Sequence, residues 1–258
     1  MILRPLYPDA PANDRWLPAW QVVERLQRQK YESCWMITQP SHAVLAGGLA
    51  ARFQAPQLPR LDADLIRAIA LHDAGWGIPD AQAITRSRAP RPQPPRSFLE
   101  TGIEEFLDAW TQSIQVAQSA GAAGAYIVSR HFQRLAEHRI GAAADTDRDR
   151  KRLQTFVAHE SQRQKRLAAK QDRSAEELES LTDVLQFCDL LSLYICSGAR
   201  ESVEFPECLG FTLRLSTEDA GYRLDPPLIG QSAKFTVAAL RYPETKEVSS
   251  TAIEVSLC

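Results

Sequence analysis

The sequence lacks the features that would place the chain in a membrane or among secreted, disulfide-bonded proteins. Its most apolar stretch, residues 184–196, is too short to cross a bilayer and contains Asp189. The first residues, MILRPLYPDAP, lack the long apolar core of a signal peptide. The five cysteines are scattered, and no two of them form a C-x-x-C pair. These absences predict a cytoplasmic protein with reduced thiols and no membrane partner.

The chain also lacks a dominant sign of charge. Its 30 basic and 32 acidic residues give a formal net charge of −2, and no arginine-rich segment offers a surface for a polynucleotide. We therefore expect no nucleic-acid partner, and any anionic ligand must be held by local groups. With 258 residues, 44% of them hydrophobic, the chain is long enough to bury a full core.

Apolar residues recur with helical spacing through most of the first 200 residues. The pattern predicts helices at 20–29, 42–53, 64–73, 98–118, 122–139, 145–170 and 176–196. Ser41 is expected to cap the second of these helices, and Asp62 or Asp64 the third. Gly75 is expected to end the third helix in a left-handed conformation.

The pattern changes after Gly198, where apolar and polar residues alternate in short segments. This alternation predicts strands at 211–216, 234–240 and 252–257, to which an early strand at 32–38 could add. We predict a mainly α fold, with a helical domain over residues 1–198 and its core at about 31–196. A small antiparallel sheet over residues 199–258 would form an appendage packed on that domain.

The segment 77–97 is rich in proline and has no helical or strand periodicity. Its length is unusual for a passive connection within one domain, and long loops of this kind are often lids or binding segments. Because it leaves directly from the end of the third helix, we predict a loop that covers whatever site that helix end forms.

Two ionisable side chains, His72 and Asp73, stand at the end of an otherwise apolar helical run, IALHDAGWG. Within a helix they would point about 100° apart, but at a helix end both can reach one point just beyond it. An imidazole and a carboxylate are standard ligands of a divalent first-row metal. The pair therefore predicts a metal site that residues of other helices complete.

Asp189 is the strongest candidate to complete this site because apolar residues flank it on nearly every side. A carboxylate buried alone costs several kcal/mol unless it is paired with a cation or bound to a metal. His42, in a first helical turn, and His131, on the buried face of its helix, are the next candidates. An ion pair of Asp189 with Arg130 or Arg163 is the alternative.

These residues occur in an order that resembles the H…HD…D signature of the HD-domain superfamily of metal-dependent phosphohydrolases. The similarity extends over roughly residues 31 to 196 and includes QPSHAVLAGGLA, AIALHDAGW, VSRHFQRL, the E-x-x-R-Q of residues 160–164, and FCDLLSLY. Together these segments resemble one bacterial family of unassigned function, DUF3891, as a branch of that superfamily. The branch has no settled substrate.

The resemblance implies an HD-domain-like helical bundle that hydrolyses a phosphate ester as a phosphatase or nucleotidase. It implies one divalent metal (Mn, Fe, Co, Ni, Zn or Mg) held by His42, His72, Asp73 and Asp189. Catalytic roles fall to Asp73, Asp80 and His131, with His131 as a weak ligand or a substrate contact. Substrate-binding roles fall to Trp76, Arg130, Arg163 and Gln164. The expected partner is a small phosphorylated molecule, and a homo-oligomer is compatible with the sequence.

Two other functions fit the same residues. Some proteins of the superfamily hold two irons and oxidise their substrate, which requires more histidine ligands than the sequence assigns here. Alternatively, a metal or an ion pair ties the helices together without catalysis, and the segment 77–97 binds a small ligand or a protein partner.

Overall fold

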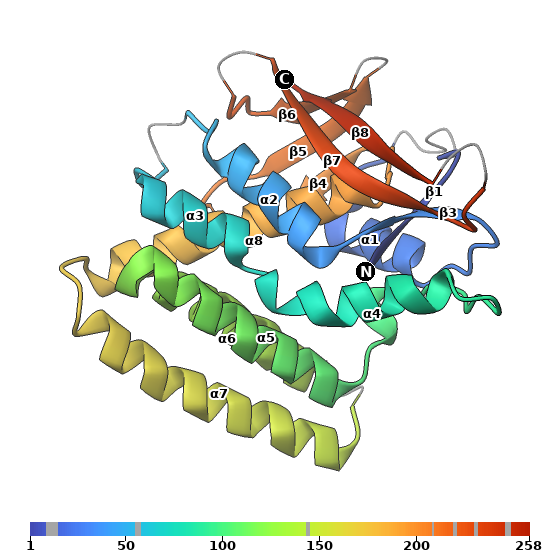
Figure 1. The fold of residues 1–258 in the computed structure, drawn as a ribbon. Coiled ribbons are helices and arrows are strands. Elements are labelled where there is room, and N and C mark those ends of the chain that lie inside the picture. Colours follow the sequence, from blue (N-terminus) through green and yellow to red (C-terminus); the bar gives the residue numbers. More distant parts are fainter. Residues whose placement is uncertain are drawn as a thin grey trace.

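A mixed α/β architecture emerges in the computed structural model, with helices packed against one large sheet (Figure 1). The described residues are 1–8, 15–54, 58–142, 145–207, 209–218, 221–229, 232–245 and 249–258. The expected thiol of Cys208 lies outside them. Among the described residues, no helix combines the length and the apolar character needed to cross a membrane.

The helices form successive layers away from the sheet. They are α1 (Ala19–Gln27), α2 (Gln39–Ala50), α3 (Ala63–Leu71), α4 (Gly77–Ser87), α5 (Ile103–Ala117), α6 (Gly121–Gly141), α7 (Asp147–Ala168) and α8 (Ala175–Cys196). Helices α1, α2 and α8 contact the sheet, α6 packs on α3, α5 and α8, and α7 packs on α6 (Figure 1). Short 3₁₀ turns lie at Ala74–Trp76 (η1), Phe98–Glu100 (η2) and Gln118–Ala120 (η3).

The sheet has eight strands in the order β1-β3-β7-β8-β6-β5-β4-β2. They are β1 (Ile2–Pro5), β2 (Leu17–Pro18), β3 (Cys34–Ile37), β4 (Val203–Phe205), β5 (Leu213–Glu218), β6 (Gly221–Asp225), β7 (Ala233–Tyr242) and β8 (Ser250–Leu257). Most pairs are antiparallel, whereas β2–β4 and β6–β8 are parallel. The central pair β7–β8 runs in register from Ala233 opposite Leu257 to Leu240 opposite Ser250.

The helices outside the segment 77–97 agree with the periodicity of the sequence, but the prediction of a mainly α chain with a small appended sheet was wrong. The sheet is mixed, and it includes the N-terminal strands β1 and β2 in addition to β3, the early strand foreseen at 32–38. These two strands were missed because β2 has only two residues and β1, with the sequence ILRP, shows no alternation of apolar and polar residues. The division into domains 1–198 and 199–258 stays a prediction, although one sheet takes strands from both sides of it.

The first half of the predicted loop 77–97 is helix α4 instead. Pro79 is the third residue of this helix, where a missing backbone N–H costs nothing because the first turn has no intrahelical acceptors for it. The other prolines of the segment lie beyond the end of α4 at Ser87. Proline content was therefore a poor guide to the structure of residues 77–87.

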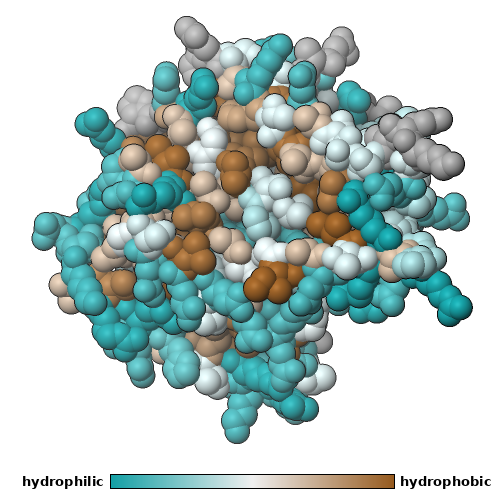
Figure 2. All heavy atoms as spheres, viewed as in Figure 1, coloured by the Kyte–Doolittle hydropathy of each residue, from teal (hydrophilic) through white to brown (hydrophobic). Residues whose placement is uncertain are grey.

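Hydrophilic side chains cover the lower part of the face in Figure 2, over α5 to α7, while apolar and small residues gather over α2, α3 and the neighbouring strands. On α7 the buried residues are only Leu153, Phe156, Glu160 and Gln164, so most of this charged helix faces solvent.

Candidate metal centre

His42 lies in the first turn of α2, which the preceding residues fix. The N-cap is Thr38 rather than the predicted Ser41: its hydroxyl accepts a hydrogen bond from Ser41 N at 3.2 Å. Pro40 is the second helical residue, a position that proline favours. The sequence did not show that α2 begins one turn earlier, because Thr38 and Ser41 are both good N-cap residues and only the backbone geometry distinguishes them. The His42 side chain is fully buried.

His72 and Asp73 lie where α3 ends. Asp62 caps the start of α3 by accepting a hydrogen bond from Leu65 N at 2.8 Å, as predicted. His72 is the C-cap residue, and Asp73 precedes the 3₁₀ turn η1. Both side chains turn toward α2 and α8, which brings the pair to one point beyond the helix end.

Gly75 holds this helix end against α5. The prediction of a left-handed Gly75 was wrong, because its φ does not lie in the positive region. The glycine is required by close packing instead: a Cβ there would lie 2.1 Å from the Ala109 carbonyl oxygen and 2.7 Å from Ser113 N. In addition, Gly75 N donates to Ser113 Oγ at 2.9 Å. The turn that carries Asp73 is therefore seated directly on the backbone of α5.

Small residues also bring α2 and α6 close to α3. A Cβ at Gly47 would lie 2.6 Å from the Ala70 Cβ, and a Cβ at Gly124 would lie 2.9 Å from the Ala68 Cβ. Because the helices approach this closely, the side chains that they carry toward one another can meet. The glycines thus set the distances among the histidines of the centre.

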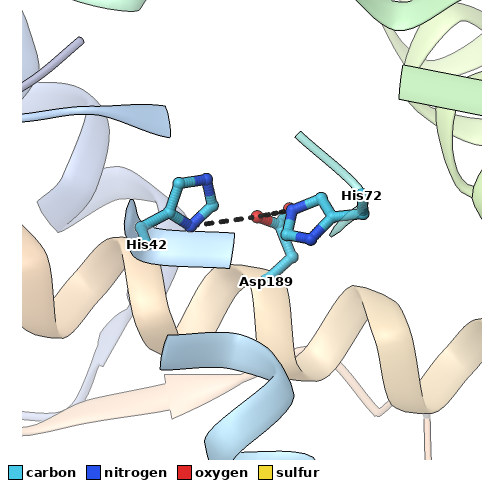
Figure 3. A group of neighbouring side chains, drawn as sticks. All are labelled: His42, His72 and Asp189. Atoms are coloured by element: carbon cyan, nitrogen blue, oxygen red, sulfur yellow. Dashed lines mark hydrogen bonds and ion pairs between the residues drawn. The ribbon is translucent and has the colours of Figure 1, made fainter. Parts of the chain in front are cut away.

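His42, His72 and Asp189 converge on one point from α2, α3 and α8 (Figure 3). His72 Nε2 lies 3.2 Å and His42 Nδ1 3.9 Å from Asp189 Oδ1. Asp73 Oδ2 lies 2.8 Å from His42 Nε2 and 3.8 Å from His72 Nε2. Metal bonds of about 2.1 Å place neighbouring ligand atoms about 3 to 4 Å apart. His42, His72 and Asp189 could therefore hold one ion, and the Asp73 carboxylate lies near both histidines.

Hydrogen bonds orient both imidazoles in the same way. His72 Nδ1 donates to the Ile69 carbonyl at 2.8 Å. The Ser192 hydroxyl donates to the Asp189 carbonyl oxygen at 2.8 Å, so its oxygen accepts from His42 Nδ1 at 2.9 Å. In each histidine the Nδ1 proton is used in one of these hydrogen bonds. In a neutral imidazole Nε2 would then be unprotonated, and its lone pair would repel the carboxylate oxygen that it faces. A cation, either a proton or a metal ion, must therefore lie between these atoms.

The charges of the cluster reinforce one another in the metal-free protein. Burial would lower the pKa of His72, but the carboxylates of Asp73 and Asp189 outweigh it and raise that pKa to about 9. Burial would likewise raise the pKa of Asp189, but the hydrogen bond and charge of His72 hold it at about 2. The cation between His72 and Asp189 at neutral pH is thus a proton.

Metal binding at this centre should depend on pH. A metal ion must displace the His72 proton, so below pH 9 the apparent affinity should fall by about tenfold for each unit of decreasing pH. Calorimetric titration of one metal in buffers of different ionisation enthalpy measures both this slope and the release of about one proton. A pH-independent affinity without proton release would show that the metal binds elsewhere.

His131 adds a third imidazole to the cluster. Its Nε2 lies 3.6 Å from Asp189 Oδ2, and its ring centroid lies 5.6 Å from that of His72. Burial lowers the pKa of His131 to about 4, so the ring is neutral at pH 7. Its Nδ1 is buried and has no hydrogen-bond partner in the described part of the chain. An unpaired buried nitrogen of this kind calls for a partner that the protein itself does not supply.

Within the described part of the chain, Asp189 forms ion pairs with histidines and with no arginine. The two arginines considered as alternatives pair elsewhere. Arg130 Nε donates to Glu179 at 3.0 Å, and Arg163 Nε lies 2.9 Å from Glu160 Oε2. The buried ion pair expected as the alternative to a metal is therefore absent for these two arginines.

Asp80 and Trp76 are engaged in other contacts. Asp80 lies on α4, where one carboxylate oxygen accepts from Gln39 N at 2.6 Å and the other lies 3.0 Å from the Met1 ammonium. Trp76 is buried and packs edge-to-face on Phe106 with ring centroids 4.9 Å apart. Their predicted catalytic and substrate-binding roles stay predictions, and these contacts give them structural roles.

Gln164 and Arg163 join α7 to α6. Gln164 Nε2 donates to Ser129 Oγ at 3.0 Å and to Gln133 Oε1 at 2.7 Å. The Ser129 hydroxyl in turn donates to Glu160, which also pairs with Arg163. The E-x-x-R-Q segment therefore forms a buried polar network between two helices, and its predicted contact with substrate stays a prediction.

Ser192 is a site residue that the sequence interpretation missed. Its one available signal is its spacing, since it follows Asp189 by three residues and thus lies near it on α8. Because it orients His42, replacement by alanine should lower metal affinity by about 10- to 100-fold. Calorimetric titration with the variant and with Ser180→Ala, an α8 serine far from the cluster in sequence, measures this. Equal affinities would show that Ser192 does not orient the ligand.

Comparison with known proteins gives a family but no activity. The family described as "Protein of unknown function (DUF3891)" matches residues 26–238. No match was found among curated proteins or among solved structures. Nothing in these comparisons places the chain in the HD-domain superfamily.

Proposed function

This chain belongs to the DUF3891 family, and we propose that it is a metal-dependent phosphohydrolase built on an HD-domain-like helical site. One observation carries the proposal. Two buried histidines, each with Nδ1 bonded within the protein, direct Nε2 toward carboxylates, an arrangement that needs a cation. The order of these residues along the chain, H…HD…D, supports the HD-type assignment.

His42, His72, Asp73 and Asp189 would hold the metal ion. Two imidazole nitrogens and two carboxylate oxygens suit Mn, Fe, Co, Ni or Zn, and Mg less well because it prefers oxygen ligands. When bound, such an ion lowers the pKa of a coordinated water and polarises a phosphoryl oxygen. Asp73 would accept the proton of that water, since its carboxylate touches the cluster and is partly open to solvent.

His131 would contact the substrate. It is neutral at pH 7 because burial lowers its pKa to about 4, so one ring nitrogen can donate a hydrogen bond and the other can accept one. Its position beside Asp189 and its unpaired Nδ1 support a role next to the reacting group. The substrate would be a small phosphorylated molecule.

Metal analysis of protein purified without chelator tests the first half of the proposal, and we expect about one ion per chain. A phosphatase screen with p-nitrophenyl phosphate and nucleoside monophosphates, repeated with each candidate metal, tests the second. The matched variants are His72→Gln, which should lose both metal and turnover, and His138→Gln, which changes an exposed histidine of α6 and should retain both. Metal uptake without hydrolysis would favour the non-catalytic alternative.

A further inference from the structure

Arg134 lies beside the metal centre along α6 and α8. It follows His131 by one turn of α6, and its guanidinium donates to Gln186, which precedes Asp189 by one turn of α8. His131 and Asp189 themselves approach to 3.6 Å. The contact of Arg134 with Gln186 is therefore next to that of His131 with Asp189, about 4.5 Å farther along each helix.

Acidic side chains of α8 hold this guanidinium in place. Its Nη1 donates to Asp183 Oδ1 at 2.6 Å, and its Nη2 donates to Glu179 Oε2 at 2.7 Å. Together with Gln186 these bonds use three of the five N–H groups of an arginine. The Nε–H and one Nη2–H have no hydrogen-bond partner in the described part of the chain. The side chain is 21% exposed, so a ligand can reach it.

Among the candidate metal ligands, only the two carboxylates are accessible to solvent. The side chains of Asp73 and Asp189 are 9% and 13% exposed, whereas those of His42 and His72 are fully buried. Asp189 belongs to the same helix as the partners of Arg134.

We propose that Arg134 binds the phosphate oxygens of the substrate through its Nε–H and its free Nη2–H. The inference rests on the proposed function and adds to it the residue that selects a phosphate group. N–H donors on a rigid planar fork match the geometry of phosphate oxygens, and the α8 carboxylates orient the fork before the ligand arrives.

Arg139 provides the control. It lies on α6 five residues after Arg134, and its Nε and Nη2 donate to Asp145 at 2.7 and 2.6 Å. Each substitution therefore removes one part-buried arginine of α6 together with its ion pair. Only Arg134 lies next to the contact of His131 with Asp189.

The experiment measures the affinity of inorganic phosphate for the metal-loaded protein by calorimetry, after metal content and thermal stability have been recorded for each variant. Arg134→Ala should bind metal normally and weaken phosphate binding by at least about tenfold. Arg134→Lys should recover only part of this loss, because lysine lacks the planar fork. Arg139→Ala should bind phosphate within about twofold of the unmodified protein.

Unchanged phosphate affinity in Arg134→Ala, or equal losses in the Arg134 and Arg139 variants, would overturn the assignment. A protein that takes up metal but binds no phosphate would overturn it as well, while leaving the metal centre intact. Failure of the unmodified protein to take up metal is a separate result, which refutes the proposed function.

Discussion

Asp189→Asn should abolish metal binding. Asparagine keeps the volume of the side chain but removes the charge that faces His72 at 3.2 Å, His131 at 3.6 Å and His42 at 3.9 Å. Loss of a charged ligand should lower the metal affinity by more than the 10- to 100-fold expected for loss of an orienting residue. We expect the metal affinity to fall by about 10³-fold or more. Metal titration followed by calorimetry measures the loss.

Thermal melts with and without chelator separate a metal ligand from a purely structural aspartate. In the unmodified protein, added metal should raise the melting temperature and chelator should reverse the rise, whereas the variant should respond to neither. Asp183→Asn is the control, since it changes an aspartate of α8 that pairs with Arg134 and lies outside the cluster. A variant that keeps the metal-dependent rise would remove Asp189 from the ligand set.

Gly75→Ala should destabilise the protein by about 3 kcal/mol or more. The added methyl group would meet the backbone of α5 at 2.1 and 2.7 Å, so either the helix or the turn that carries Asp73 must move. Because that turn positions Asp73, metal affinity should fall with stability. Denaturant unfolding and metal titration of the same samples measure the two effects.

Gly77→Ala is the matched control for this change. Gly77 begins α4 only two residues further on, and a Cβ there would meet nothing within 4 Å. Its backbone is helical, so alanine should leave stability unchanged or raise it by up to about 1 kcal/mol. Similar losses in both variants would show that the effect comes from glycine in general and not from the packing of η1 on α5.

The metal candidates were predictable from the sequence because each is an ionisable residue within an apolar helical pattern. His42, His72, Asp73 and Asp189 are unfavourable in a core unless they compensate one another, so their convergence follows from the cost of burying charge. The structure brings together the same four side chains over 147 positions of chain, from His42 to Asp189. What they bind, and what reaction they support, is the part that stays a proposal.

Other features depend on long-range contacts that periodicity does not encode. The strands β1 and β2 show no alternation of apolar and polar residues, and they pair with β3 and β4, which come from later segments of the chain. Gly75 resembles a helix stop in sequence, yet its role is set by the backbone of α5. The orienting role of Ser192 likewise appears only once α2 and α8 are adjacent. Each was missed because its cause lies in another segment.

A metal-loaded crystal, measured at the absorption edge of the added metal, tests the central claim most directly. The account predicts one anomalous peak within about 2.0 to 2.2 Å of His42 Nε2, His72 Nε2 and carboxylate oxygens of Asp73 and Asp189. A peak at another position, or none at this cluster after loading with each candidate metal, would contradict it.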